Sequence, residues 1–495
     1  MFARVTLSAA VLALLSGALP SGAALAAQDT ITLGMVLEPP NLDPTSGAAA
    51  AVDEVVYANI FEGLTRIGPD GTVRPALAAS WDVEEAGKVY VFHLHPGVSF
   101  HDGNAFDAQD VIFSLDRARA ADSTNAQKEL FSGIDKIEAV DPQTVKITLK
   151  SPDGGFPFKM AWGDAVMVDP ASVKDIATRP IGTGPFRFES WRQGDSLKIA
   201  AFDGYWGEKP QIKSATFRFI SDPTAAFAAV MAGDVDAFPN YPAIETLPQL
   251  EADPRFKVSV GTTEGETILA MNNAKAPLDN LKVRAAIAHA MNRKELIDGA
   301  MFGYGTPIGS HFAPHNPDYV DLTAKSAFDP ELSRKLLAEA GVTDLKLRLA
   351  LPPPPYARRG GEIVAQELKA VGIATEITNM EWAQWLETVF KGGDFDLTII
   401  SHVEPMDIGI YARDDYYFHY AKPAFKALMA KLQETVDPAQ RSALLVEAQE
   451  MIADDYVNAF LFQLPKIGVA DARITGLWEN APMPANDLSE VRWTD

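Results

Sequence analysis

The stretch from Pro75 to Arg117 constrains the fold of this chain more than any other part of the sequence. Residues 89–94 alternate in strand fashion at Val89, Val91 and, after a break at His93, Leu94, and the pairs Pro96-Gly97 and Asp102-Gly103 favour tight turns. A helix is expected next, with Asp107 as its N-cap and Asp110 completing a capping box. Its predicted buried stripe is Val111, Leu115 and Ala118. These signals predict a compact unit of a strand, turns and a helix, and by themselves they do not indicate a catalytic or binding function.

The residues of this stretch resemble those of a known family. The pattern LAxSW, followed after a short gap by YxFxLxxGVxFxDGxxFxAxDVxFSL, is similar to the most characteristic segment of periplasmic solute-binding proteins of the oligopeptide, dipeptide and nickel class, family 5 of the bacterial extracellular solute-binding proteins. Further segments that resemble this family are GTGPF (182–186), FAAVMAGDVDAF (227–238), VRAAIAHAMNR (283–293), RKLLAEAG (334–341) and ELKAVGI (367–373). The resemblance extends from about Ile31 to at least Asp396.

The resemblance implies an α/β fold with the two lobes of a class II-like periplasmic binding protein and an extra small subdomain in the first lobe. We expect a signal peptide at 1–26, lobe I at 27–267 with the subdomain at about 60–180, lobe II at 268–472, and a return to lobe I at 473–495. Such proteins deliver ligands to membrane-embedded ABC permeases. The chain is therefore expected to be a monomer that binds a solute without catalysis.

The N-terminus predicts the compartment. A positive MFAR segment, an apolar run from Val5 to Leu19 and the small-residue pattern Ala24-Leu25-Ala26 are typical of a cleaved signal peptide, so the mature protein is expected in the periplasm, with no membrane anchor. An uncleaved anchor is the alternative. No other run approaches the roughly 20 apolar residues that a membrane span needs.

Composition excludes several classes of function. The sequence contains no cysteine, which rules out disulfides, thiolate catalysis and a lipid-modified cysteine. The formal net charge of −23 argues against nucleic acid or an anionic membrane as a partner.

The remaining secondary-structure signals predict alternating strands and helices. A helix is expected at Val56–Leu64 from the family pattern, a hairpin at Asp135–Lys150 and one helix over 281–297 capped by Asp279 or Asn280. A further helix is expected at 361–371. Such alternation favours mainly parallel sheets.

Common catalytic motifs are absent from the sequence. It contains no GxSxG, HExxH, SxxK or Rossmann glycine pattern, so a secreted periplasmic hydrolase is the alternative from another class, and a periplasmic holdase is a third. His93 and His95 lie at alternate positions of a predicted strand, where two imidazoles can chelate a metal, and His311 and His315 flank a proline-containing loop, but no further ligand stands at a diagnostic spacing from either pair. We therefore expect no metal and no cofactor.

The expected ligand site lies on loops that follow strands. Glu38 and Asn41 belong to the loop EPPNLDP, which in the family borders the ligand cleft, although both could instead satisfy local amides as turn residues. Thr183 lies in GTGPF, where closely spaced glycines permit close backbone approach. The segment Phe395–Tyr420 supplies the remaining candidates, which are His402, Glu404, Asp407, Tyr411 and Arg413.

In peptide-binding relatives the loop after this last strand carries an acidic anchor for the amino terminus of the peptide. The resemblance places Glu404 there, with Asp407 three residues later, although Ser401 replaces the tryptophan of the family pattern and the proline is displaced. We expect Glu404 or Asp407 to bind a cationic group and Arg413 to pair with an anionic end of a zwitterion. The alternative is a salt-bridged surface loop.

A peptide is the first choice of ligand, with an oligosaccharide, an opine-like conjugate or a metal or haem chelate as alternatives. Trp382 and Trp385 could stack on a ligand, but their helical spacing favours a place in the core.

Overall fold

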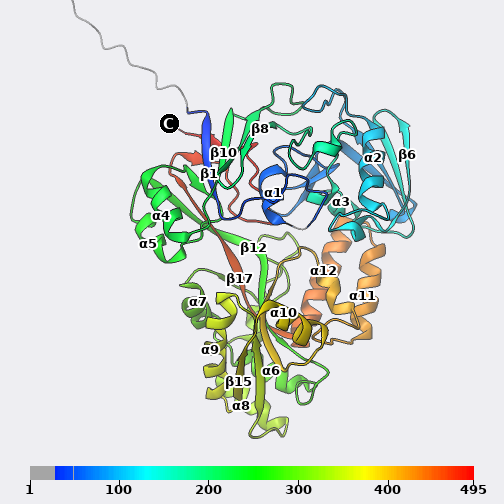
Figure 1. The fold of residues 1–495 in the computed structure, drawn as a ribbon. Helices are drawn as coiled ribbons and strands as arrows, with labels where there is room; N and C mark the ends of the chain where they lie inside the picture. Colours follow the sequence, from blue (N-terminus) through cyan, green and yellow to red (C-terminus); the bar gives the residue numbers. More distant parts are fainter. Residues whose placement is uncertain (1–27, 48, 495) are drawn as a thin grey trace, which may run out of the picture.

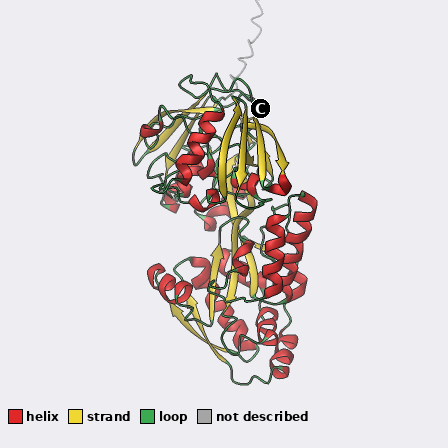
Figure 2. Cartoon of the chain, turned by 90° about the vertical axis from the view of Figure 1, so that its right-hand side faces the viewer, coloured by secondary structure: helices red, strands yellow, loops and turns green. Residues whose placement is uncertain are grey.

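Two long antiparallel strands, β12 (Phe256–Met271) and β17 (Asn458–Asp471), connect the two lobes of the molecule (Figure 1). This computed structural model describes residues 28–47 and 49–494, and the expected signal peptide at 1–26 lies outside them. Pairing of the two strands is interrupted between Thr262 and Glu266. Figure 2 shows long strands that run from one lobe into the other. None of the described helices has the length and apolar character that crossing a bilayer requires.

One mixed sheet runs through both lobes because β12 and β17 belong to each. Within the described residues its order is β15-β14-β16-β12-β17-β11-β1-β10-β9-β8, and β13 pairs with β17 beside this path. The remaining strands of this sheet are β1 (Thr30–Met35), β8 (Phe186–Arg192), β9 (Ser196–Ala201), β10 (Ser214–Phe219), β11 (Ala237–Phe238), β13 (Thr306–Pro307), β14 (Lys346–Leu351), β15 (Ala374–Asn379) and β16 (Leu397–His402).

Lobe I surrounds the strands β1 and β8–β11 with short helices and with the end of the chain. Its helices are α1 (Ala50–Val56), α3 (Phe156–Lys159), α4 (Pro223–Ala232) and α5 (Leu247–Glu251). Helix α4 begins at the N-cap Asp222 and ends at Gly233, whose φ of 74° suits a glycine. The small ribbons β2 (Thr65–Ile67) with β3 (Val73–Pro75), and β18 (Ile474–Thr475) with β19 (Arg492–Trp493), complete the lobe.

The small subdomain of lobe I is a four-stranded antiparallel sheet with a helix packed on it. Its order is β4-β5-β7-β6. The elements are β4 (Ala78–Glu84), β5 (Val89–Leu94), β6 (Ile134–Asp141), β7 (Thr144–Leu149) and α2 (Ala108–Arg119). Asp107 and Asp110 form the predicted capping box of α2, and the predicted stripe of this helix is buried. The predicted hairpin is present as β6 and β7.

Lobe II places helices on both faces of β14–β16 and the lower halves of β12 and β17. These helices are α6 (Leu281–His289), α7 (Arg293–Met301), α8 (Pro330–Glu339), α9 (Pro355–Ala370), α10 (Trp382–Trp385), α11 (Pro423–Glu434) and α12 (Pro438–Asp454). Two apolar clusters, one on each face of the strands, form the core of the lobe. The lobes meet within β12 and β17, so a division at 267/268 falls inside a strand, and the residue limits of the lobes stay a prediction.

Four local predictions are wrong. The expected helix at Val56–Leu64 is absent, because α1 ends at Val56 and Ala58 adopts a φ of 58°. The expected single helix over 281–297 is two helices, because Asn292 caps a new one. Helix α9 begins at Pro355, six residues before the predicted start at Gly361, since proline suits the first turn of a helix. The sheets are mixed instead of mainly parallel, because β12 and β17 return antiparallel.

The buried face of β5 consists of Tyr90, Phe92 and Leu94, and Val89 at the start of the strand is also buried. Val91 and His93 are half-buried. Of the residues named in the predicted alternation, Val89 and Leu94 are therefore buried and Val91 is not.

Candidate functional site

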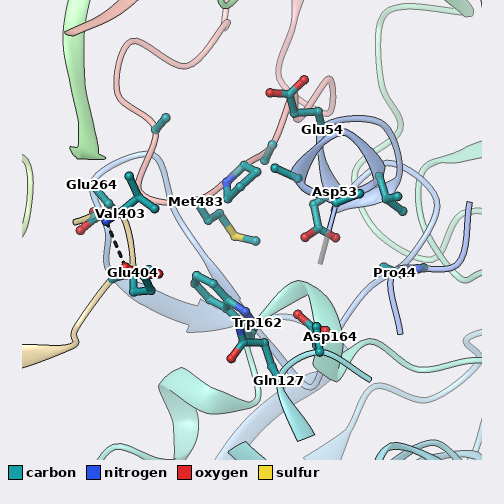
Figure 3. Close-up of a pocket in the computed structure, with 18 of the residues that line it drawn as sticks. Pro44, Asp53, Glu54, Gln127, Trp162, Asp164, Glu264, Val403, Glu404 and Met483 are labelled. Atoms are coloured by element: carbon teal, nitrogen blue, oxygen red, sulfur yellow. Dashed lines mark hydrogen bonds between the residues drawn. The ribbon is translucent and has the colours of Figure 1, made fainter. Parts of the chain in front are cut away.

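A cavity of about 630 Å³ lies between the lobes, beside the connecting strands. Its lobe I wall comes from α1, the loop before it and the short 3₁₀ turn Gly163–Ala165 (Figure 3). Residues 263–265 of β12 and 464–465 of β17 form its back, and residues 403–405 reach it from lobe II. Residues 481–485 of the C-terminal segment close the remaining side. A solute in this cavity would contact both lobes and the strands between them.

Carboxylates dominate the polar lining of the cavity. Six acidic side chains line it, and among its described lining residues there is no lysine, arginine or histidine. The six are Asp43, Asp53, Glu54, Asp164, Glu264 and Glu404. The cavity therefore favours a ligand with positive charge.

Three of these carboxylates have partners behind the cavity wall. Asp43 forms an ion pair with Arg117 at 2.9 Å, and Oε1 of Glu264 lies 2.7 Å from Nε2 of His315. Glu54 accepts a hydrogen bond from Asn240 at 3.0 Å. Burial raises the pKa of Glu54 to about 7 despite this bond and the nearby charge of Lys466. Each of these three carboxylates therefore already has a partner within the protein.

Asp53 and Asp164 differ because each has an unsatisfied oxygen. Among the described residues no donor reaches Oδ1 of either side chain, and both atoms are buried. Burial raises the pKa of Asp164 to about 7, and burial together with the charges of Asp164 and Glu54 raises the pKa of Asp53 well above its usual range. Both carboxylates are directed toward the space beside Trp162 (Figure 3).

Apolar side chains complete the lining. The largest are Phe158 and Trp162, whose ring centroids lie 5.9 Å apart, and they are joined by Leu130, Val403, Leu464 and Met483. An apolar wall with a few charged groups is typical of a site for a small organic molecule.

One predicted site residue, Glu404, lines the cavity. The residue is exposed, and its Oε2 accepts a hydrogen bond from the backbone N–H of Val403 at 3.1 Å. Asp407, on the same loop, lies outside the lining, and its Oδ1 is 2.7 Å from His311 Nε2. Arg413 is exposed and contacts Asp415 at 3.2 Å, with its guanidinium 5.2 Å from the Tyr416 ring.

The other predicted site residues have structural partners instead of a place in the cavity lining. In lobe I, Glu38 accepts from Trp191 Nε1 and the Gly194 amide, both at 2.9 Å, and Asn41 accepts from the Asp43 amide at 2.8 Å. Thr183 is fully buried and donates to Glu62 at 2.8 Å.

In lobe II, His402 lies 3.0 Å from the Tyr417 hydroxyl, and Tyr411 is buried with its hydroxyl accepting from Asn458 at 3.2 Å. Trp385 is likewise a core residue that donates to Thr398, while Trp382 is exposed.

A buried ion network supports the loop that carries Glu404. His311 Nδ1 lies 2.7 Å from Glu266 of β12, and its Nε2 contacts Asp407. Burial alone would lower the pKa of His311, but the two carboxylates outweigh that effect and raise it to about 10. We take His311 as protonated, so that its charge links the connecting strand to the loop.

Two sets of residues bear on metal binding. His402, Glu404 and Asp407 offer ligand atoms within 4.8 Å of one another, although both ring nitrogens of His402 face tyrosine hydroxyls. His93 and His95 do not form a pair, since His93 contacts Asp82 and His95 packs on Trp206.

The sequence patterns did not predict that Asp53, Asp164 and Trp162 line the cavity. A usable signal was present, because Asp53 interrupts the apolar run AAVDEVV and Asp164 interrupts MAWGDAVM. A carboxylate within an apolar run is either paired or placed at a functional surface.

Two lobes that are joined by crossing strands and enclose a lined cavity define a binding protein that holds a small solute between its lobes. Comparison with known proteins specifies the family. Residues 72–419 match the model of the bacterial extracellular solute-binding proteins, family 5. The chain belongs to this family, whose members are the solute-binding components of ABC importers.

Individual relatives cover most of the chain. A glutathione-binding protein of Salmonella paratyphi A is 33% identical over 479 residues, covering 92% of this chain and 93% of that protein. The dipeptide-binding protein of Escherichia coli is 30% identical over 382 residues and 70% of each chain. The structure of HbpA2 from Haemophilus parasuis has a TM-score of 0.85 at 23% identity, over 94% of this chain and all of that one, which shows the shared fold.

Proposed function

We propose that this protein is a monomeric periplasmic receptor that captures a peptide or peptide-like solute with a free ammonium group and delivers it to an ABC permease. The observation that carries this proposal is the cavity between the lobes, lined by carboxylates that include Glu404 from lobe II. A charge-assisted hydrogen bond between Glu404 and an ammonium group would offset the loss of hydration on binding. The named ligands of the relatives, glutathione and dipeptides, support a peptide-like solute.

The lining favours some peptide-like solutes over others. Among the described residues that line the cavity there is no basic side chain to pair with a carboxylate of the ligand. Arg413, the predicted partner for such a group, is exposed and pairs with Asp415. We therefore expect a solute with net positive charge to bind better than one with several carboxylates.

We further propose that binding occurs without turnover. Ligand contacts to both lobes would favour a closed arrangement, which the permease would bind. Recovery of an intact ligand after prolonged incubation with the protein would support this, and a hydrolysed ligand would instead support the hydrolase alternative.

The test of the proposed function compares a tripeptide with its N-acetylated form by isothermal titration calorimetry. We expect Ala-Ala-Ala to bind and N-acetyl-Ala-Ala-Ala to bind at least about tenfold more weakly, since acetylation removes the ammonium charge. Replacement Glu404→Gln should abolish this difference. Equal affinity of both peptides for the native protein would contradict the ammonium anchor, and no binding of either would contradict the peptide ligand.

A further inference from the structure

The Asp53–Asp164 pair on the lobe I wall forms a second acidic group in the cavity, separate from Glu404 on lobe II. Asp164 is only 6% exposed, and its Oδ1 has no donor among the described residues. Asp53 comes from α1 and also carries a buried Oδ1 without a donor. Figure 3 shows both carboxylates pointing into the same part of the cavity, next to the indole of Trp162.

The pair is held in place by close packing. A Cβ atom at Gly163 would lie 2.6 Å from Oδ1 of Asp53, so the carboxylate rests directly on the backbone that carries Asp164. Only glycine permits this approach. The positions of the two carboxylates are therefore set by how α1 packs on the turn Gly163–Ala165.

Two cations beside other carboxylates of the lining, Arg117 at Asp43 and Lys466 at Glu54, are committed elsewhere. Arg117 pairs with Asp43 at 2.9 Å. The Lys466 ammonium donates to two backbone carbonyls, those of Pro239 at 3.2 Å and Trp478 at 2.6 Å. A buried carboxylate with an oxygen that no donor reaches is costly unless it takes up a proton or meets a cation. Since this pair faces a cavity that is open to solutes, a cation from the ligand can supply the missing partner.

We propose that Asp53 and Asp164 form a subsite for a second cationic group of the ligand, an amine or guanidinium that lies against Trp162. This proposal rests on the proposed function, in which Glu404 binds the first ammonium group. The ligand class is then narrowed to solutes with two separated positive charges, such as peptides with a basic side chain. The face of Trp162 adds a favourable cation–π contact for the second group.

The test uses three probes in isothermal titration calorimetry. The peptides Ala-Lys-Ala and Ala-norleucine-Ala differ by one ammonium group, and 1,5-diaminopentane carries two ammonium groups without a peptide unit. We expect Ala-Lys-Ala to bind at least about tenfold more tightly than Ala-norleucine-Ala. In Asp164→Asn this preference for Ala-Lys-Ala over Ala-norleucine-Ala should fall below about threefold.

Two further variants guard against a trivial result. Asp53→Asn should also reduce the preference for Ala-Lys-Ala, because it removes the other carboxylate of the pair. Asp175 is an exposed aspartate in the same lobe that does not line the cavity, so Asp175→Asn should leave this preference unchanged. Thermal melting of each variant would show that it folds.

The possible failures can be told apart. Equal affinity of the native protein for the two peptides would overturn the subsite and leave the proposed function standing. Binding of diaminopentane without either peptide, lost in Asp164→Asn, would support the subsite and contradict the peptide ligand. Binding of none of the three probes would overturn both.

Discussion

The backbone N–H of Gly154 donates a hydrogen bond to the carbonyl oxygen of Gln433 at 3.0 Å. Gly154 belongs to the small subdomain of lobe I, and Gln433 lies near the end of α11 in lobe II, so this bond joins the lobes away from β12 and β17 (Figure 1). Gly87 contributes to the same junction, because a Cβ there would lie 2.2 Å from Val436. The arrangement of the lobes therefore depends on a second contact besides the connecting strands.

Replacement Gly154→Ala should weaken this junction. The added Cβ would lie 2.0 Å from the carbonyl oxygen of Thr435, a backbone atom, so the turn between α11 and α12 must move away. We expect a larger radius of gyration in small-angle X-ray scattering, because the lobes separate more freely. Gly133→Ala, where no atom lies within 4 Å of the added Cβ and the backbone is not left-handed, is the control for stability, and an unchanged scattering curve for Gly154→Ala would contradict the prediction.

Replacement Glu404→Gln should weaken binding of a peptide ammonium group with little effect on folding. Glu404 is exposed and accepts from the amide next to it, so its loss leaves no buried group unsatisfied. We expect the dissociation constant to rise about tenfold or more and the melting temperature to change little. Glu362→Gln, an exposed residue of α9 outside the cavity lining, should change neither, and a large fall in melting temperature for Glu404→Gln would point to a structural role instead.

Replacement Thr183→Val should lower stability and leave affinity unchanged. Thr183 donates to the buried carboxylate of Glu62, which also accepts from Tyr205 and Trp206, each at 3.0 Å. Removal of one donor to a buried charge costs about 1–3 kcal/mol. Urea unfolding would measure the cost, with the exposed Thr178→Val as control. A clear loss of ligand affinity at unchanged stability would instead support the predicted ligand contact of Thr183.

The affinity for a dication should depend on pH. Burial raises the pKa of Asp164 to about 7, and burial with nearby negative charge raises the pKa of Asp53 well above its usual range, so in acid both groups hold protons that a cation must displace. The affinity for Ala-Lys-Ala should therefore fall as the pH is lowered from 7 to 5.5, by up to about tenfold per pH unit for each proton displaced. Calorimetry of Ala-norleucine-Ala over the same range is the control. Identical pH profiles for the two peptides would show that these carboxylates do not interact with the lysine ammonium group of Ala-Lys-Ala.

His311 should make stability fall at alkaline pH. Its pKa is raised from 6.5 to about 10 in the folded protein, so its contribution is complete below about pH 6.5 and is lost as the pH rises through 10. The free energy of unfolding should fall more steeply over this range in the native protein than in His311→Gln. The variant itself should be less stable than the native protein near pH 7, because Asp407 and Glu266, whose pKa burial raises to about 8, lose the cation that lies between them. Parallel pH profiles would show that His311 is neutral in the folded state.

Local interactions in this protein follow from the sequence. Asp107 and Asp110 form the predicted capping box of α2, and the predicted hairpin is present as β6 and β7. Each of these features depends on residues within a few positions of one another, so a single sequence can predict it. The family motifs likewise indicated the two-lobed fold and the role in ABC import, because their pattern extends over most of the chain.

The composition of the cavity is decided by the tertiary structure. Asp53 and Asp164 lie far apart in the sequence and meet because α1 packs on the backbone of Gly163. His402 and Tyr411, which belong to the same polar and aromatic segment as Glu404, turn into the core of lobe II because tyrosine hydroxyls and Asn458 satisfy them there. The sequence by itself determined which polar residues the chain contains and which helices and turns they occupy. Only the packing of the lobes decided which of those residues face the ligand, since that depends on contacts between segments that no local pattern relates.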